Sequence, residues 1–286
     1  MNNILVTGSN GQLGSEIKAL ASKYANYNFI FTDVAELDIA NHKVVEEFIN
    51  THRINTIINC AAYTAVDKAE GQEDLANNIN YLAVANFAQI AKKNTIKLIH
   101  ISTDYVFDGT NYKPYIETDV PNPQSVYGQT KLDGELALQK INPANAIIIR
   151  TSWVYSKFGS NFVKTMLRLA ETRDEISVVA DQIGSPTNAA DLANAILRIL
   201  PNINNESVEL FHYSNEGVCS WYDFAKAIFE LSSLDIKIHP IETNQYPTPA
   251  KRPYYSVLSK NKIKEDYQIE IPYWRTSLKS MIQTIQ

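Results

Sequence analysis

Through its first 150 residues the sequence alternates short apolar segments with longer segments of helical periodicity, and this alternation constrains the fold most strongly. The apolar segments cover residues 4–6, 29–31, 57–59, 98–101 and 147–149. Between them lie segments long enough to be helices, among them residues 14–24, 43–51, 73–93 and 127–140. Because strands that are apolar on both faces must be covered on both faces, the pattern predicts an α/β fold built on a doubly wound parallel sheet.

A glycine-patterned turn follows the first apolar segment and opens the first helical one. The turn contains Gly8, Asn10, Gly11, Gln12, Leu13 and Gly14. Glycine permits a tight turn and lets backbone amides approach a pyrophosphate, while the N-terminus of the following helix favours an anion. Its place directly after a first strand predicts the phosphate site of a Rossmann-like dinucleotide-binding domain.

Asp33 ends the second apolar segment, about twenty residues past the turn. A carboxylate at this place would accept hydrogen bonds from the adenosine ribose of a dinucleotide. No lysine or arginine lies between Asp33 and Lys43, so a 2′-phosphate has no obvious partner there. We therefore expect NADH to bind at least as well as NADPH.

After residue 150 the alternation becomes irregular. Helices are predicted near residues 161–171, 189–200 and 221–231, strands near 176–179 and 208–213, and an extended proline-rich loop over 246–253. We expect residues 1–150 to form the dinucleotide-binding domain. Residues 151–286 should form a smaller C-terminal α/β substrate lobe, with some segments returning to the first domain. The cleft between two such parts is the natural ligand site.

Tyr127 and Lys131 lie four residues apart in a predicted helix, so both side chains project from one face. We expect the ammonium, with an oxidised nicotinamide, to lower the pKa of the phenol from about 10 to about 7, a change worth roughly 4 kcal/mol. Thr103 follows the strand at residues 98–101, at the sheet edge where ligands bind, and can hydrogen-bond a substrate carbonyl. The three side chains predict carbonyl reduction with hydride from a nicotinamide.

Several longer segments carry a family resemblance. They are residues 59–62, 65–70, 102–107, 150–155, 161–166 and 246–253, besides the glycine turn and the Tyr127/Lys131 pair. Through them the chain resembles the extended short-chain dehydrogenase/reductase superfamily and, within it, the dTDP-4-dehydrorhamnose reductase family over nearly its whole length. The resemblance implies reduction of the 4-keto group of dTDP-4-dehydro-6-deoxy-L-mannose by NADH or NADPH. The product would be dTDP-L-rhamnose, a precursor of cell-surface polysaccharide.

The resemblance also implies roles for individual residues. Thr103, Tyr127 and Lys131 match the catalytic positions, with Tyr127 as the proton donor. Tyr127 and Lys131 would also contact the cofactor. The other positions that match cofactor contacts are Gly11, Gln12, Leu13, Asp38, Ile39, Ala62, Tyr63 and Thr64, with Ala61 beside them.

Three residues are candidates for binding the sugar nucleotide. Asp104 and Trp153 match sugar-nucleotide contacts of the family. Arg252 lies in the proline-rich loop and is our candidate for the diphosphate, because a guanidinium binds phosphate through two donors at once. We expect a sugar nucleotide as the small-molecule substrate.

A magnesium ion occurs at a dimer contact in some members of the family, held by a glutamate of the first helix and a second glutamate past a Gly-x-Pro-Thr segment. Glu16 matches the first position, but Ala190 occupies the second and Asp191 follows one residue later. One residue along a helix rotates a side chain by about 100°. We therefore expect no metal site; magnesium at Glu16, with a homodimer, stays as an alternative.

The composition bears on partners and location. With 31 acidic and 26 basic residues the net charge is −5, and no basic stripe predicts a nucleic-acid partner. No leader-like start and no long apolar run occur, so we expect no membrane contact and a cytoplasmic enzyme. Cys60 and Cys219 lie in core-like segments and predict buried thiols. The five histidines lack metal-ligand spacing and predict surface or packing roles.

Three other functions stay open from the sequence. A reductase that gives the 4-epimer, dTDP-6-deoxy-L-talose, would use the same residues. A sugar-nucleotide epimerase or dehydratase shares the scaffold, although dehydratases carry Thr-Asp-Glu where Tyr105 here follows Asp104. A non-catalytic regulatory subunit could have the same fold as well.

Overall fold

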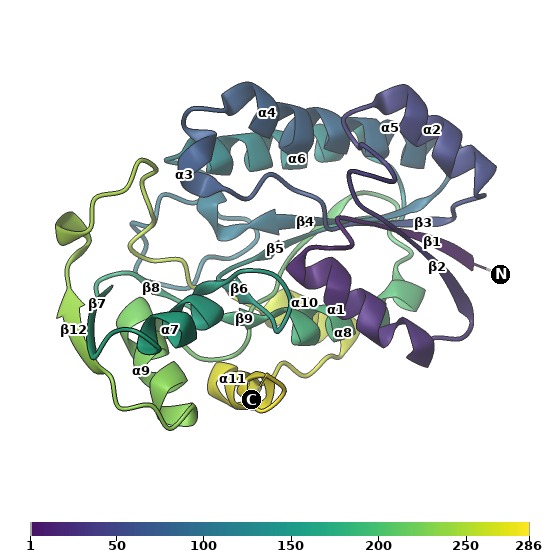
Figure 1. The fold of residues 1–286 in the computed structure, drawn as a ribbon. Helices are drawn as coiled ribbons and strands as arrows, with labels where there is room; N and C mark the ends of the chain where they lie inside the picture. Colours follow the sequence, from purple (N-terminus) through teal and green to yellow (C-terminus); the bar gives the residue numbers. More distant parts are fainter. Residues whose placement is uncertain (1, 286) are drawn as a thin grey trace.

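The computed structural model describes residues 2–285, and its centre is a parallel sheet of six strands (Figure 1). The strands are β1 (Asn2–Thr7), β2 (Tyr27–Thr32), β3 (Thr56–Asn59), β4 (Lys97–Thr103), β5 (Ala146–Thr151) and β10 (Glu209–His212). Their order is β10-β5-β4-β3-β1-β2, and every neighbouring pair is parallel. This confirms the doubly wound sheet. Because β2 and β3 lie on opposite sides of β1, a crevice opens at the carboxyl ends of β1 and β3, where such sheets bind ligands.

Side chains alternate between the two faces of the sheet, which explains why the strands are apolar throughout. In β1, Ile4 and Val6 belong to the same core cluster as Ile17 and Ile196, whereas Leu5 belongs to the cluster on the opposite face. The first face is covered by α1 (Gln12–Leu20), α8 (Ala189–Ile199) and α10 (Asn261–Tyr267), and the second by α2 (His42–Thr51), α5 (Ala83–Asn94) and α6 (Val126–Ile141) (Figure 1). Each face of the sheet therefore has its own core.

The segment predicted as one helix over residues 73–93 is helical throughout but changes pitch in its middle. After α3 (Val66–Ala69), the helix begins as α4 (Glu73–Asn77), passes through a π-helical turn (Asn78–Leu82) and continues as α5. A π turn is uncommon and often accompanies a functional site, because it turns side chains away from the regular helical faces. Here it directs a buried Asn80 out of the helix.

The chain after β5 builds further elements around a core of its own. The helices are α7 (Phe162–Ala170), α9 (Trp221–Leu231) and α11 (Trp274–Ile282). The strand pairs are β6 (Val154–Tyr155) with β9 (Thr187–Asn188), β7 (Glu175–Val179) with β12 (Lys237–Ile241), and β8 (Ile183–Gly184) with β11 (Cys219–Ser220). Short 3-10 turns cover Ala21–Lys23, Asp104–Val106, Leu200–Asn202 and Thr243–Gln245. Because β10, α8 and α10 lie on the main sheet, the chain crosses repeatedly between the two parts.

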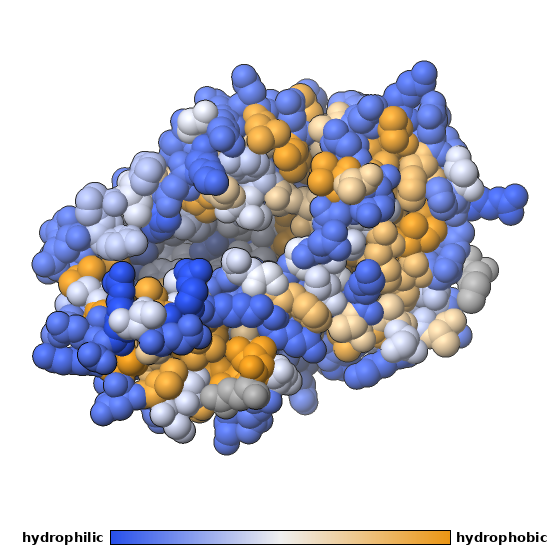
Figure 2. Space-filling model, viewed as in Figure 1, coloured by the Kyte–Doolittle hydropathy of each residue, from blue (hydrophilic) through white to orange (hydrophobic). Residues whose placement is uncertain are grey.

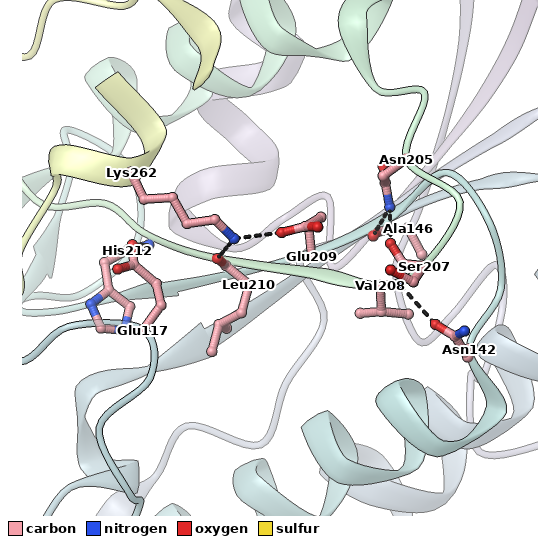
Figure 3. Close-up of polar contacts among 10 residues, drawn as sticks. All are labelled: Glu117, Asn142, Ala146, Asn205, Ser207, Val208, Glu209, Leu210, His212 and Lys262. Atoms are coloured by element: carbon pink, nitrogen blue, oxygen red, sulfur yellow. Dashed lines mark hydrogen bonds and ion pairs between the residues drawn. The ribbon is translucent and has the colours of Figure 1, made fainter. Parts of the chain in front are cut away.

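The strand β10 forms one edge of the main sheet, and side chains from elsewhere close its outer side (Figure 3). The carbonyl oxygen of Leu210 accepts a hydrogen bond from Nζ of Lys262 at 2.9 Å. The backbone N–H of His212 donates to Oε1 of Glu117 at 3.1 Å. An edge strand with open backbone groups can pair with another chain, so these contacts protect the sheet from that pairing.

The proline-rich segment has neither helix nor strand over residues 246–253, as predicted. It returns to the first half of the chain, where the N–H of Ala250 donates to Oδ1 of Asp67 at 3.2 Å. Figure 2 shows the surface hollowed between the sheet-bearing part and the C-terminal elements. The chain therefore offers a concave ligand site beside the carboxyl ends of the strands.

Two further properties follow from the described residues. Across residues 2–285, no helix combines the length and the apolar character needed to cross a membrane. Cys60 and Cys219 are free thiols, and burial raises the pKa of the Cys60 thiol to about 12. Both thiols therefore remain protonated at neutral pH, but the prediction of a buried thiol is confirmed only for Cys219, because Cys60 is half-buried.

Candidate active site

A cavity of about 830 Å³ lies at the carboxyl ends of the sheet strands, in the hollow of Figure 2. The predicted site residues along its wall are Gly8, Asn10, Gly11, Gln12, Leu13, Asp33, Asp38, Ile39, Ala61, Ala62, Thr64, Thr103, Asp104, Tyr127, Lys131 and Trp153. Among the described residues, Gly14, Tyr63 and Arg252 are not part of this wall. The structure thus brings the glycine turn, the three predicted catalytic side chains and Trp153 to one continuous space.

The glycine turn has the geometry of a phosphate site. Gly8 has a φ of 63°, and a Cβ there would lie 2.7 Å from Cα of Ala61. A Cβ on Gly14 would lie 2.6 Å from Cα of Ser9, so only glycine lets α1 start this close to the turn. Gly11 is the N-cap residue of α1, and within the described chain no side chain caps the helix there. The first amides of α1 are therefore available to an anion.

Asp33 lines the cavity and also stabilises the glycine turn. Its Oδ2 accepts a hydrogen bond from the N–H of Asn10 at 3.0 Å, and its Oδ1 accepts one from the N–H of Val34 at 2.9 Å. Each carboxylate oxygen has a second lone pair. The contact with Asn10 therefore leaves Asp33 able to accept hydrogen bonds from a ribose.

Asn80, which was not predicted from the sequence, holds the segment that includes Tyr63 through hydrogen bonds. Oδ1 of Asn80 accepts from the N–H of Tyr63 at 2.9 Å, and its Nδ2 donates to the Tyr63 carbonyl at 3.1 Å and to Oγ1 of Thr130 at 3.2 Å. Asn80 is a positioning residue for the cavity wall at Ala62 and Thr64. The signal in the sequence was a run of three asparagines at 77, 78 and 80, which is unfavourable in a regular helix.

The predicted catalytic side chains come from β4 and the first turns of α6. Thr103 ends β4, whereas Tyr127 and Lys131 lie one turn apart on α6, as predicted. The helix begins at this point because Oγ of Ser125 accepts a hydrogen bond from the N–H of Gly128 at 3.2 Å. Only 5% of Thr103, 9% of Tyr127 and 1% of Lys131 is exposed, so any reaction here occurs largely out of water.

The pKa of Tyr127 lies above its ordinary value in the protein alone. Burial raises it to about 12, the Thr103 hydroxyl acts in the opposite direction, and the Asp104 carboxylate raises it further. The expected lowering to about 7 depends on an oxidised nicotinamide as well as on Lys131, so it stays a prediction for the protein with its cofactor bound; in the protein alone, removing the phenol from water raises the pKa. Tyr127 therefore holds its proton throughout the neutral range, as a proton donor must.

Lys131 is bound by the backbone and by a histidine. Its Nζ donates to the carbonyl oxygen of Ile101 at 2.6 Å and lies 3.4 Å from Nε2 of His100. Burial lowers the pKa of Lys131 to about 8, although the Glu135 carboxylate acts to raise it. His100 was predicted to have only a surface or packing role; its place beside Lys131 follows from strand pairing that no local pattern encodes.

Asp104 and Tyr105 follow Thr103 in the wall of the cavity. Asp104 is only 2% exposed, and its Oδ1 accepts from the Thr103 hydroxyl at 3.1 Å. Burial raises the pKa of Asp104 to about 6, although hydrogen bonds, including that from Thr103, act to lower it. The ring of Tyr105 packs edge-on against Tyr127 with centroids 5.4 Å apart. Tyr105, where a dehydratase would need a carboxylic acid, is thus an aromatic support for Tyr127.

Comparison with known proteins agrees with this geometry. All of residues 1–286 match the family model described as "RmlD substrate binding domain". The chain belongs to the RmlD family. The dTDP-4-dehydrorhamnose reductase of Aggregatibacter actinomycetemcomitans is 41% identical, over 98% of each chain.

Two solved structures resemble this RmlD-family chain over nearly its whole length. A dTDP-4-dehydrorhamnose reductase from Clostridium acetobutylicum is 47% identical with a TM-score of 0.93, covering 99% of each chain. A dTDP-4-dehydrorhamnose reductase from Bacillus anthracis, solved in complex with NADP, is 38% identical with a TM-score of 0.94, covering 99% of this chain and 100% of that chain. The RmlD-family fold is therefore shared from end to end.

In this RmlD-family chain Trp153 has a strained backbone and a defined support. Its φ is 50°, in the left-handed region that a bulky residue rarely adopts. Its ring stacks on Trp221 with centroids 3.6 Å apart and an angle of 9° between the planes. A Cβ on Gly184 would lie 2.6 Å from Cε2 of Trp153, so glycine leaves the room that the indole fills. The strain and the tight support hold Trp153 at the cavity wall.

Arg252 of this RmlD-family chain forms an ion pair outside the cavity wall. Its Nη1 and Nη2 donate to the two carboxylate oxygens of Asp67 at 3.0 and 2.8 Å. The hydrogen bond to Arg252 is the main reason that the pKa of Asp67 is lowered. In this structure the guanidinium is paired with the Asp67 carboxylate. Contact of Arg252 with a diphosphate stays a prediction.

Glu16 is buried within the RmlD-family fold, and its Oε1 accepts a hydrogen bond from Oγ of Ser156 at 2.6 Å. Asp191 has a different hydrogen-bond partner. Its Oδ2 accepts a hydrogen bond from Nδ2 of Asn215 at 2.7 Å. Across residues 2–285, no three His, Cys, Asp or Glu side chains are grouped so that they could hold a metal ion. Glu16 and Asp191 thus have different hydrogen-bond partners, and magnesium at Glu16 stays an untested alternative.

Proposed function

We propose that this chain reduces the 4-keto group of dTDP-4-dehydro-6-deoxy-L-mannose with NADH or NADPH, giving dTDP-L-rhamnose, and that Tyr127 is the proton donor. One observation carries the proposal. Thr103, Tyr127 and Lys131 line the cavity that begins at the glycine turn, in a chain 41% identical to a named dTDP-4-dehydrorhamnose reductase. The NADP complex of the Bacillus anthracis relative supports a nicotinamide cofactor.

The residues fit such a cofactor, because available amides of α1 lie at one end of the cavity and Tyr127 and Lys131 line the same space. When bound, NADH or NADPH supplies the hydride for the keto carbon. Tyr127 then donates its proton to the alkoxide oxygen. The alcohol that forms is, like water, a weaker acid than a phenol, even one whose pKa burial raises to about 12, so transfer of the proton to the alkoxide is favourable. Thr103 orients the keto oxygen, and the Lys131 ammonium stabilises the tyrosinate that remains.

The neighbouring residues argue against the other enzymes that share the scaffold. A dehydratase needs a carboxylic acid after Asp104, where this chain has the half-buried Tyr105. A regulatory subunit would not need a threonine, a tyrosine and a lysine together in a buried cavity. A reductase that gives the 4-epimeric product, dTDP-6-deoxy-L-talose, would differ only in which face of the sugar meets the nicotinamide. Identification of the product by NMR distinguishes the two reductases.

We further propose a preference for NADH at least equal to that for NADPH, since Asp33 lines the cavity and its carboxylate would repel a 2′-phosphate. Initial rates with each cofactor at a subsaturating concentration measure this preference. A preference for NADPH of more than about tenfold, roughly 1.4 kcal/mol, would overturn it.

The resemblance and the sequence also support three broader proposals. Residues 1–150 form mainly the cofactor part and residues 151–286 mainly the sugar-nucleotide part. The protein works in the cytoplasm and has no nucleic-acid partner, and a homodimer stays the alternative to a monomer. Light scattering on the purified protein measures the oligomeric state, and a monomeric mass would contradict the dimer.

The function is tested by incubating the protein with dTDP-4-keto-6-deoxy-L-mannose and NADH, following NADH oxidation, and identifying the product by NMR. Oxidation of NADH with formation of dTDP-L-rhamnose supports the proposal. Formation of dTDP-6-deoxy-L-talose would assign the epimeric reductase instead. An isomeric sugar formed without NADH consumption by protein that carries bound NAD would assign an epimerase. If the protein bound sugar nucleotides but converted none of them, the regulatory subunit would be favoured.

A further inference from the structure

A buried line of polar side chains crosses three strands and ends at Lys131. Oγ1 of Thr7 donates to Oδ1 of Asn59 at 2.7 Å, and Nδ2 of Asn59 lies 3.1 Å from Nδ1 of His100. Nε2 of His100 then lies 3.4 Å from Nζ of Lys131. The parallel register explains the line, because Thr7 pairs with Asn59 across β1 and β3, and Asn59 pairs with His100 across β3 and β4.

None of these four side chains has more than 1% of its surface exposed. Polar groups buried this deeply must satisfy one another, so their hydrogen bonds have to be mutually consistent. Burial, with the nearby charge of Lys131, holds the pKa of His100 well below its ordinary value. His100 is therefore neutral, with one ring nitrogen that donates and one that accepts.

The charge of Lys131 decides which nitrogen of His100 carries the hydrogen. An ammonium can only donate, so Nε2 must then accept, and Nδ1–H must donate to the oxygen of the Asn59 amide. The amide nitrogen then faces Thr7, whose hydroxyl oxygen can accept. An uncharged amine also has a lone pair that accepts, so it permits the reverse direction, in which Nε2–H donates to Nζ and the Thr7 hydroxyl donates to Oδ1 of Asn59, the orientation of Asn59 found in this structure. A rotation of the Asn59 amide by about 180° interconverts the two.

We propose that His100 is a positioning residue for Lys131, so that the ring and the Ile101 carbonyl together hold the Lys131 ammonium at the cavity, while the Asn59 amide satisfies the other ring nitrogen in either tautomer. The inference rests on the role that the proposed function gives to Lys131. It adds a residue outside the cavity wall, because His100 reaches the site only through Lys131.

Other charged or titratable groups near Lys131 do not replace His100. They are Tyr127 and Glu135 on α6, Asp104 after β4, and Arg150 on β5. The Glu135 carboxylate binds Arg150 through Nε and Nη2 at 3.0 and 2.6 Å and also accepts from the Ser102 hydroxyl. Since Glu135 is already bound, losing the His100 acceptor leaves the ammonium with fewer hydrogen bonds, and Lys131 should lose its proton at lower pH.

The first experiment compares His100→Gln with His100→Leu. Glutamine can place an acceptor near the position of Nε2, whereas leucine fills similar space without one. We expect the basic limb of the pH profile of kcat/KM to move about one pH unit towards lower pH in His100→Leu and to stay near the wild-type position in His100→Gln. A His100→Leu limb that superimposes on the wild-type limb would overturn the proposal, as would an equal shift in both variants.

A second measurement uses the wild-type protein, so it does not depend on whether the leucine variant folds. The ¹⁵N shifts of His100 in histidine-labelled protein distinguish an N–H nitrogen from a bare one. We expect the hydrogen on Nδ1 below the pKa of Lys131, which burial lowers to about 8, and on Nε2 above it. The change should vanish in Lys131→Met. A single unchanged tautomer across this range in the wild type contradicts the inference.

The activity of Lys131→Met separates this inference from the proposed function. Full reductase activity in that variant would remove Lys131 from the mechanism and with it the positioning role of His100. Loss of activity in Lys131→Met, together with an unshifted His100→Leu profile, would overturn only the role of His100.

Discussion

Arg252 binds both carboxylate oxygens of Asp67 through its two terminal nitrogens, at 3.0 and 2.8 Å, and so ties the proline-rich loop to α3. Asp67 also accepts from the N–H of Ala250 at 3.2 Å, which fixes the loop backbone beside the same carboxylate. The loop that is predicted to meet the sugar nucleotide is therefore anchored to the cofactor half of the chain.

Replacing Arg252 should weaken sugar-nucleotide binding selectively. In Arg252→Met we expect KM for the sugar nucleotide to rise by about tenfold or more, since hydrogen bonds to charged groups contribute roughly 1.5–3 kcal/mol each. KM for NADH should change little. Steady-state kinetics measure both, with Lys251→Met as the matched control, because Lys251 is an exposed neighbour whose Nζ contacts Gln124 at 3.4 Å. Equal effects in the two variants would show that Arg252 has no special role.

Glu135 and Arg150 form a buried ion pair whose disruption should destabilise the fold. Their charged groups are 1% and 3% exposed, and the guanidinium also lies 4.9 Å from the centre of the Phe107 ring. In Glu135→Gln the Arg150 charge stays buried without its counter-ion, so we expect a loss of about 3 kcal/mol or more in the free energy of unfolding.

Urea unfolding of Glu135→Gln measures this loss, and Glu46→Gln provides the control. Glu46 pairs with Lys93 at 2.7 Å, but the two side chains are 40% and 70% exposed, so its loss should cost less than about 1 kcal/mol. Comparable destabilisation in both variants would contradict the distinction between the buried pair and the exposed pair.

Asp104 should make the stability of the protein depend on pH. Burial raises its pKa to about 6, so the folded state favours the protonated form more than the unfolded state does. The stabilising contribution is complete below the ordinary value of 3.8 and is lost as the pH rises through about 6. Relative to wild type, Asp104→Asn should therefore gain up to about 3 kcal/mol between pH 4 and pH 8.

Urea unfolding at several pH values tests the sign, and Asp108→Asn is the opposite case. Hydrogen bonds, first that from the Thr110 N–H, hold the pKa of Asp108 down to about 2, so its contribution is present above 3.8 and is lost only as the pH falls through about 2. Asp108→Asn should thus be less stable than wild type by an amount that stays constant from pH 5 to pH 8. A constant difference for Asp104→Asn as well would contradict its raised pKa.

Much of the fold could be predicted from local pattern. The segment at residues 4–6 is apolar at every position because Ile4 and Val6 face one helical layer and Leu5 faces the other. A buried parallel strand can be identified from its own apolar residues, without knowing which strand it pairs with. The five strands predicted up to residue 150 therefore coincide with strands of the structure. The π turn around Asn80 was not predicted. Over a short segment it leaves the spacing of the apolar residues almost unchanged, so the apolar pattern carries no sign of it.

The candidate site was predictable where one short segment carries the chemistry and not where distant segments meet. Tyr127 and Lys131 are four residues apart, so helix geometry alone places them together. The line from Thr7 through Asn59 to His100 depends on the register of three strands, and no single segment contains it. The rise in the pKa of Tyr127 in the protein alone was not foreseen, because a one-dimensional pattern shows a neighbouring charge but not the extent of burial.

The most direct test of the account is the rate of NADH-dependent reduction by Tyr127→Phe, measured with the binding of NADH to the same protein. Phenylalanine keeps the ring that packs on Tyr105 and removes only the hydroxyl. We predict turnover reduced by about a thousandfold or more, within the range that general acid catalysis contributes together with loss of the oriented donor, and NADH affinity within about threefold of wild type. Tyr112→Phe, at an 82% exposed position, should match the wild type in both measurements. Wild-type turnover in Tyr127→Phe would contradict the account.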